Sequence, residues 1–238
     1  MTLPERVEAV KRKIAAAALE AGRDPAEVTL VAATKVQTSD TIRQAIAAGI
    51  TVCGENRVQE MTAHLDDDAY AGAALHFIGH LQTNKVKYVV GRVDMIESID
   101  SRRLLEAVEA RAAHLDLVQD ILLEINVGGE ASKSGAAPGE ALNLARLAVQ
   151  MPHIRLRGLM AIPPAARAPG ENRHFFAEMY RLYVDIRTAL DHNVTDMDCL
   201  SMGMSGDYED AVREGATHVR VGTALFGPRP PMEAQRQG

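Results

Sequence analysis

The sequence alternates short segments rich in β-forming residues with longer helical segments, and this alternation constrains the fold more than any other feature. Several of the short segments are almost continuously apolar, which is typical of parallel strands covered on both faces. The predicted strands are residues 29–34, 50–53, 75–79, 94–98, 120–127, 155–161, 198–202 and 217–222. The predicted helices are residues 4–21, 38–48, 57–68, 82–91, 101–114, 137–150, 171–191 and 206–214, followed by one helical turn near 223–227.

Eight strands separated by seven helices, with the helix at 4–21 in front, predict a single (β/α)8 TIM barrel of the α/β class. Parallel strands need crossover connections, and the helices supply them. A doubly wound nucleotide-binding sheet is not favoured, because the first strand–helix junction, ATKVQTSDTI, lacks the G-x-G-x-x-G fingerprint. We expect one domain over residues 1–227, an active-face loop over 163–170 and a flexible tail over 228–238.

Composition and charge exclude several classes of protein. The net charge of −6 gives no basic footprint for nucleic acid, and no segment approaches the roughly 20 apolar residues of a membrane span. The N-terminus lacks the apolar core of a signal peptide, so we expect a cytoplasmic protein. Cys53 and Cys199 each lie in an apolar segment, which favours buried thiols over a disulfide. No H-E-x-x-H motif or cluster of cysteine and histidine predicts a metal site.

Polar residues gather directly after the predicted strands, where the working residues of a barrel lie. The opposite ends of the same strands carry fewer polar residues of this kind. This asymmetry predicts a functional site at one end of the barrel. The polar residues in question are Lys35, Glu55, Asn56, Arg57, His80, Gln82, Thr83, Asn84, Ser98, Asp100, Ser101, Asn126, Ser201, Ser205 and Thr223.

Two loops, after the seventh and eighth strands, predict phosphate binding. SMGMSG (201–206) is expected to open a helix, and Gly222-Thr223 a final turn. Small residues let backbone N–H groups approach an anion, hydroxyls add donors, and helix N-termini contribute favourable dipoles. Helix capping alone would explain either loop. Barrels often bind phosphate at this pair of loops, however, so the two together favour a phosphate site.

A lysine that ends an apolar strand beside such loops has a chemical use. The stretch VTLVAATKVQ (28–37) runs through a predicted strand to Lys35. A lysine that projects into a phosphate-binding pocket is placed to form a Schiff base, and partial burial would lower the pKa of its amine. Without the phosphate loops, a lysine that simply reaches solvent is the plainer interpretation. With them, the natural ligand is an aldehyde carrying its own phosphate, pyridoxal 5′-phosphate (PLP).

Arg220 completes the predicted site. It lies two residues before Gly222, so strand alternation places both on one face. If that face points inward, the guanidinium reaches the pyridine nitrogen of the cofactor. Arginine stays protonated and offers only donors, so it would leave this nitrogen unprotonated and weaken the ring as an electron sink. The alternative is a surface ion pair with a nearby carboxylate such as Glu209 or Asp210.

Seven segments together resemble the YggS/PROSC family of pyridoxal phosphate homeostasis proteins. They occur in order through nearly the whole chain: VAATKVQ, GENRVQE, HFIGHLQTNK, INVGGEASKSG, RGLMAIPP, LSMGMSGDYEDAV and VRVGTALFG. The resemblance implies a barrel like the N-terminal domain of alanine racemase, with the cofactor bound to Lys35, Asn56 beside it and Arg220 facing its pyridine nitrogen. The residues implied to hold the phosphate are Ser201, Ser205, Gly222 and Thr223.

The resemblance also implies a function. Such proteins bind, buffer and hand over the cofactor rather than act as efficient enzymes, with PLP-dependent apo-enzymes as possible recipients. Two alternatives stay open: a PLP-dependent amino-acid racemase of low activity, and a Schiff-base aldolase acting on a phosphorylated sugar. The sequence ends soon after the eighth strand, where racemases of this barrel type continue into a second domain that supplies a tyrosine base. We therefore expect a carrier, and a monomer.

Overall fold

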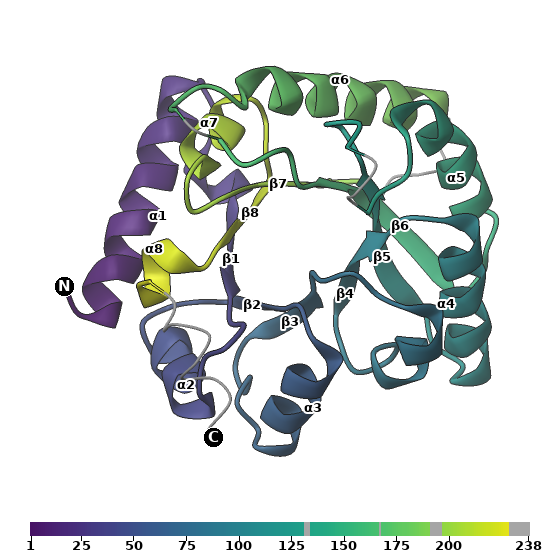
Figure 1. Ribbon diagram of the computed structural model, residues 1–238, viewed down its shortest axis with the longest axis horizontal. Coiled ribbons are helices and arrows are strands. Elements are labelled where there is room, and N and C mark those ends of the chain that lie inside the picture. The colour runs from purple at the N-terminus through teal and green to yellow at the C-terminus, as the bar shows by residue number, and fades with distance from the viewer. Residues whose placement is uncertain (131–133, 167, 191–196, 229–238) are drawn as a thin grey trace.

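The computed structural model describes residues 1–130, 134–166, 168–190 and 197–228. Eight parallel strands follow one another around a closed barrel in chain order, and β8 pairs with β1 (Figure 1). The strands are β1 (Thr29–Ala33), β2 (Val52–Glu55), β3 (Ala74–Phe77), β4 (Met95–Ile99), β5 (Gln119–Ile125), β6 (Ile154–Ala161), β7 (Cys199–Met204) and β8 (His218–Val221). This confirms the predicted (β/α)8 barrel, and each strand overlaps its predicted range.

Helices form the outer ring of the barrel, and α1 lies beside α7 and α8 (Figure 1). The α-helices are α1 (Leu3–Glu20), α2 (Ser39–Ala47), α3 (Val58–Asp66), α4 (Arg102–His114), α5 (Ala141–Ala148), α6 (Arg173–Ala189), α7 (Tyr208–Arg213) and α8 (Thr223–Phe226). Three short 3₁₀ helices are η1 (Pro25–Glu27), η2 (Thr83–Tyr88) and η3 (Pro138–Glu140).

The segment predicted as a helix over 82–91 is the 3₁₀ helix η2 and not an α-helix, so that prediction was wrong in type. Val86, Val89 and Val90 are all buried there, and the segment packs against α4. β-Branched side chains lose rotamer freedom in an α-helix, which lowers their helix propensity. Burial of three valines in a short crossover therefore favours the tighter turns.

Strand β7 continues to Met204, beyond its predicted end at residue 202. Gly203 makes this possible, because it adopts a φ of +88°. The register between β7 and β8 shifts between Ser201 and Met204, on either side of this glycine. A Cβ at Gly203 would lie 2.5 Å from the Cβ of Ala211 on α7, so only glycine fits under this helix. The sequence analysis expected the segment that begins at Ser201 to open a helix. Ser201 instead lies within β7.

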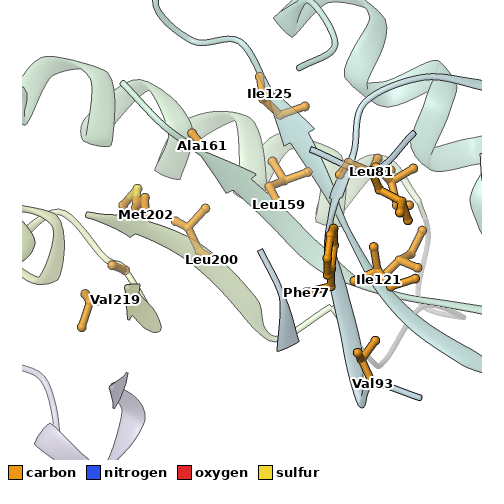
Figure 2. Packing of buried hydrophobic residues seen from close by; sticks show 14 of the residues in the cluster. Phe77, Leu81, Val93, Ile121, Ile125, Leu159, Ala161, Leu200, Met202 and Val219 are labelled. Atoms are coloured by element: carbon orange, nitrogen blue, oxygen red, sulfur yellow. The ribbon is translucent and has the colours of Figure 1, made fainter. Parts of the chain in front are cut away.

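Two sets of apolar side chains form the core. The larger set lies between the strands and the surrounding helices, and Figure 2 shows part of it, with Phe77, Leu159 and Leu200 from three strands. Each fully buried side chain of this size contributes roughly 1.5–3 kcal/mol to the free energy of folding. The smaller set lies inside the barrel and consists of Met95, Leu122, Met160 and Cys199. It supports the pocket that opens at one end of the barrel.

Both cysteines are buried free thiols, as predicted, and burial raises the pKa of Cys53 to about 12. Within the part of the chain that the structure describes, no helix is both long enough and apolar enough to cross a membrane. Residues 229–238 of the predicted tail, and residue 167 of the predicted loop 163–170, lie outside the described residues.

Candidate functional site

A pocket of about 350 Å³ lies at the end of the barrel where the strands finish. Its walls come from the ends of β1, β2, β3, β5, β7 and β8, so segments far apart in sequence meet there. Six of the seven predicted site residues line it: Lys35, Asn56, Ser205, Arg220, Gly222 and Thr223. The carboxyl ends of barrel strands are where this fold places its chemistry.

Lys35 lies in a tight turn directly after β1 and is half-buried. The N–H of Gln37 closes this turn by donating to the carbonyl of Thr34 at 3.0 Å. The next residue, Val36, has a φ of +59°. A positive φ is sterically unfavourable for a β-branched residue and costs of order 1–3 kcal/mol. Strained backbone therefore lies immediately beside the candidate nucleophile.

The pocket has a corner built from small residues and hydroxyls. The Oγ of Ser205 accepts hydrogen bonds from the N–H groups of Gly222 at 3.1 Å and Ala224 at 3.2 Å. Since this oxygen accepts twice, its own proton stays available for an anion. A Cβ on Gly206 would meet no atom within 4 Å, so this residue borders open space. With Thr223, these groups fit a phosphate.

Asn56 contributes an unused acceptor. It follows β2 and lines the pocket, and its Oδ1 is buried without a hydrogen-bond partner in the described part of the chain. A buried acceptor of this kind costs free energy until a donor reaches it. A bound ligand with a donor group beside Asn56 would satisfy the atom. The position agrees with the sequence-based expectation for this residue.

Arg220 points into the barrel and is only 4% exposed. Its Nη1 donates to the Oγ of Ser201 at 2.6 Å, and its Nη2 donates to the carbonyl of Ala161 at 2.8 Å. The alternative of a surface ion pair is wrong, because the carboxylates of Glu209 and Asp210 pair with other cations, Lys13 and Arg213.

Beneath Arg220 the hydrogen bonds continue through the barrel. Ser201 donates to Oε2 of Glu97 at 2.6 Å, and Nδ1 of His76 lies 2.7 Å from Oε1 of the same carboxylate. Nη1 of Arg220 is 3.9 Å from Oε2 of Glu97. The guanidinium is therefore held by fixed partners, Ser201, Ala161 and Glu97, while it lines the pocket.

These contacts set the charge states inside the barrel. Burial opposes ionisation of Glu97, but the hydrogen bond to His76 and the charges of His76 and Arg220 outweigh it and lower the pKa of Glu97 to about 2. Burial lowers the pKa of the neighbouring His218 to about 4, so that ring is neutral near pH 7. Burial also lowers the pKa of Arg220, although the facing carboxylates oppose this.

Ser201 is the one predicted site residue that the structure does not bring to the pocket wall. Its side chain is fully buried and its hydroxyl links Glu97 to Arg220. The predicted phosphate contact treated Ser201 as the start of a loop that opens a helix, whereas β7 runs from Cys199 to Met204 and holds Ser201 within the strand. The residue supports Arg220 from behind.

Glu124 is a pocket residue that the sequence analysis missed. It lies on β5, is 3% exposed and accepts a hydrogen bond from the Oγ of Ser134 at 2.8 Å. Burial raises the pKa of this carboxyl, and the nearby Asp100 raises it further. The sequence did contain an indication of this residue, because Glu124 is the single acid in the otherwise apolar run ILLEI. A lone charge in a buried strand points into a site more often than into a core.

The residues present fit an aldehyde that carries a phosphate and a ring nitrogen. Lys35 offers the amine, the corner at Ser205, Gly206, Gly222 and Thr223 offers donors for the phosphate, and Arg220 offers a donor for the ring nitrogen. The described residues contain no group of histidine, cysteine and acid side chains able to hold a metal ion. The donor set thus matches PLP.

Known proteins point to the same chemistry. Residues 7–230 match the family model "Alanine racemase, N-terminal domain". The chain is 40% identical over 229 residues to the pyridoxal phosphate homeostasis protein of Aquifex aeolicus (strain VF5), a match that covers 96% of this chain and 99% of that protein. It is 41% identical over 229 residues to the protein of the same description in Pseudomonas aeruginosa, with 96% of each chain covered.

A solved structure gives a further comparison. PipY of Synechococcus elongatus PCC7942, with PLP bound, is similar to this chain with a TM-score of 0.82 and 31% sequence identity. The match covers 95% of this chain and 100% of that one.

Proposed function

This chain belongs to the family of pyridoxal phosphate homeostasis proteins, built on the alanine racemase N-terminal-domain barrel, and we propose that it holds PLP on Lys35. In this proposal the protein buffers the cofactor and delivers it, and it does not act as an efficient catalyst. The observation that carries the proposal is one pocket in which Lys35, the Ser205 corner and Arg220 converge.

Each group has a distinct part in binding. The Lys35 amine would hold the cofactor through a reversible Schiff base to its aldehyde carbon, with the carbonyl oxygen released as water. Ser205 and Thr223 orient the cofactor by its phosphate through hydroxyl and backbone donors, and Gly222 borders the same corner and holds Ser205 in place through its N–H. Asn56 offers a buried acceptor oxygen in the same pocket that has no partner among the described residues.

Arg220 supports a carrier over a catalyst. Bound PLP would supply an electron sink, which is stronger when its ring nitrogen carries a proton. Arg220 has donors alone, and the contacts to Ser201 and Ala161 hold its guanidinium in place. A fixed cation at this position keeps the nitrogen unprotonated. The protein can then bind the cofactor without strongly promoting reactions on it.

A second candidate, a PLP-dependent racemase of low activity, is favoured by Glu124. This buried carboxyl lines the same pocket as Lys35, and both groups can move a proton. If the protein is a carrier, the proposal implies that PLP-dependent apo-enzymes receive the cofactor from it. We expect this protein to act as a monomer in the cytoplasm.

The test is the visible absorption spectrum of the purified protein with added PLP, before and after borohydride reduction, followed by peptide mapping. We expect a yellow protein, a reduced adduct on Lys35 and loss of the band in Lys35→Ala. Lys13→Ala is the matched control, because Lys13 is an exposed lysine paired with Glu209 on the outer surface. A wild type that stays colourless, or an adduct unaffected by Lys35→Ala, would overturn the proposal.

Turnover separates the two candidates. Racemisation of amino acids by the loaded protein is expected to be far slower than about 1 per second, the lower end for ordinary enzymes. A rate within the ordinary range would replace the carrier with the racemase. In that case Glu124→Gln is expected to lower the rate without removing the band.

A further inference from the structure

The turn that carries Lys35 is held in an unfavourable backbone conformation. Thr34 to Gln37 form a four-residue turn in which Val36 occupies the third position with a φ of +59°. A positive φ at this position normally selects glycine or asparagine. Valine persists in such a conformation only where surrounding contacts determine it.

One contact comes from Glu60 in the first turn of α3. The N–H of Val36 donates to Oε2 of Glu60 at 2.9 Å. The other oxygen of this carboxylate lies 3.1 Å from Nη1 of Arg57, so each oxygen has its own partner. Hydrogen bonds from a backbone N–H to a carboxylate are among the stronger ones, because the acceptor is charged.

A second acid holds the other neighbour of Lys35. The hydroxyl of Thr34 donates to Oε1 of Glu55 at 2.6 Å, and the N–H of Thr34 donates to the carbonyl of Gly54 at 3.0 Å. The residues before and after Lys35 are therefore both bound by the short segment 54–60. Glu55 accepts from the side chain of Thr34, whose φ is not positive. Glu60 accepts from the backbone amide of Val36, which is the strained residue itself.

We propose that Glu60 is a positioning residue, which holds the turn at Val36 in its strained conformation so that the amine of Lys35 is presented to the pocket. The inference rests on the proposed function, since it concerns the same lysine. Glu60 does not line the pocket. It acts through the backbone of Val36. Without its carboxylate the turn is free to relax to a negative φ, which redirects the side chain of Lys35.

A simpler interpretation makes Glu60 an acid that stabilises the N-terminus of α3. Arg57 at the N-cap makes no side-chain capping bond, and Glu60 is the acidic residue of the first turn. Such a role depends on the negative charge. Holding the amide of Val36 depends instead on an acceptor oxygen at that place. The two interpretations separate when the charge is removed and the acceptor is kept.

The first experiment compares Glu60→Gln with Glu60→Ala by titrating PLP and following the visible band. Loss of a hydrogen bond to a charged acceptor predicts about tenfold weaker binding for Glu60→Ala. Glu60→Gln keeps an acceptor oxygen, and we expect it to bind within about threefold of the wild type. Asp40→Ala is the matched control, because Asp40 lies in the first turn of α2 and pairs with Arg43 in the same manner. It is expected to bind as the wild type does.

The second experiment uses the strain itself. In the Val36→Gly background the turn needs no support, so Glu60→Ala is expected to weaken binding less than about threefold there, compared with about tenfold beside Val36. Hydrogen exchange of the Val36 amide, measured without PLP, is expected to accelerate in Glu60→Ala. Thermal unfolding checks that each variant is folded.

Equal binding by Glu60→Ala and the wild type would overturn the inference. So would equal losses in Glu60→Gln and Glu60→Ala, which assign the effect to charge, or an effect of Glu60→Ala that is the same in both backgrounds. A wild type that forms no adduct on Lys35 overturns the proposed function instead. Exchange at Val36 still reports then on whether Glu60 holds the turn.

Discussion

Two buried carboxylates, Glu97 and Glu55, lie on opposite sides of the barrel wall and are satisfied in different ways. Both are fully inaccessible to solvent. Glu97 faces the inside, where its two oxygens are divided between His76 and Ser201 and the cation of Arg220 lies 3.9 Å away. It is part of a buried ion pair.

Glu55 faces the outside, between β2 and the helical segment that follows. One of its oxygens receives the hydroxyls of Thr34 at 2.6 Å and Tyr70 at 2.9 Å, with Nδ1 of His64 at 3.2 Å. Its other oxygen has no partner among the described residues. Its donors are two hydroxyls and an imidazole, whereas Glu97 faces a guanidinium.

The comparison shows how one pocket is supported from two directions. Inside the barrel, a carboxylate fixes the charged group that faces the ring nitrogen, and charge compensation is the reason for the arrangement. Outside, a carboxylate orders hydroxyls behind the turn of Lys35, and hydrogen bonding is the reason. The two acids therefore differ in what their removal leaves behind. Removal of Glu97 leaves a buried cation, and removal of Glu55 leaves hydroxyls that have lost their charged acceptor.

Removal of Glu97 is expected to have the largest effect. Glu97→Ala leaves the guanidinium of Arg220 buried without its carboxylate, which predicts a loss of about 3–5 kcal/mol in the free energy of unfolding. Urea denaturation followed by circular dichroism measures this. Glu106→Ala is the control, since it breaks an exposed pair with Arg102 that contributes about 1 kcal/mol or less. Equal losses in the two variants would contradict the assignment of a buried ion pair.

Removal of Glu55 is expected to cost less. Glu55→Ala removes the charged acceptor of the Thr34 and Tyr70 hydroxyls, although Thr34 also donates to the carbonyl of Gly54 at 3.2 Å and the hydroxyl of Tyr70 lies 3.1 Å from Nδ1 of His64. A buried hydroxyl left without any acceptor costs roughly 1–3 kcal/mol. Part of this is recovered where a hydroxyl turns to another acceptor, so we expect a total near the lower end of that range. Glu55→Gln keeps one acceptor oxygen and is expected to lie between the wild type and Glu55→Ala. A Glu55→Ala protein as unstable as Glu97→Ala would remove the difference between the two sites.

The smallest expected effect concerns the pH dependence of the Glu55 cluster. The hydrogen bond to Glu55 raises the pKa of His64 despite the opposing effect of burial. A raised pKa in the folded state means that His64 stabilises the protein below its unfolded pKa of about 6.5, and that this stabilisation is lost as the pH rises through the folded value. Unfolding measured between about pH 6 and 9 should show this loss in the wild type, and His64→Gln should abolish it. If the wild type became more stable than His64→Gln as the pH rises over this interval, the predicted direction of the His64 pKa shift would be wrong.

Much of the site was predictable because strand ends are local features. Lys35 and Arg220 were identified from an apolar run and from alternation along a strand, and both line the pocket. Ser201 lies behind the pocket wall because its hydroxyl is bound by Glu97 on β4 and Arg220 on β8, and the sequence around Ser201 does not reveal these partners. Glu124 was missed although its place in an apolar strand was visible in the sequence.

The sequence by itself determined the barrel, its strand order and most of the pocket, because periods of two and of about three and a half residues depend on local backbone geometry. Only the tertiary structure decided which polar groups meet. Ser201 and Glu97 are 104 residues apart and lie on β7 and β4, which are not adjacent in the sheet. Their side chains meet across the interior only when the barrel closes. The strained φ of Val36 likewise has no pattern in the sequence, since the acid that holds it comes from α3, in the next unit of the barrel. The contact between Ser201 and Glu97 depends further on closure of the whole sheet, which is a property of all eight strands together.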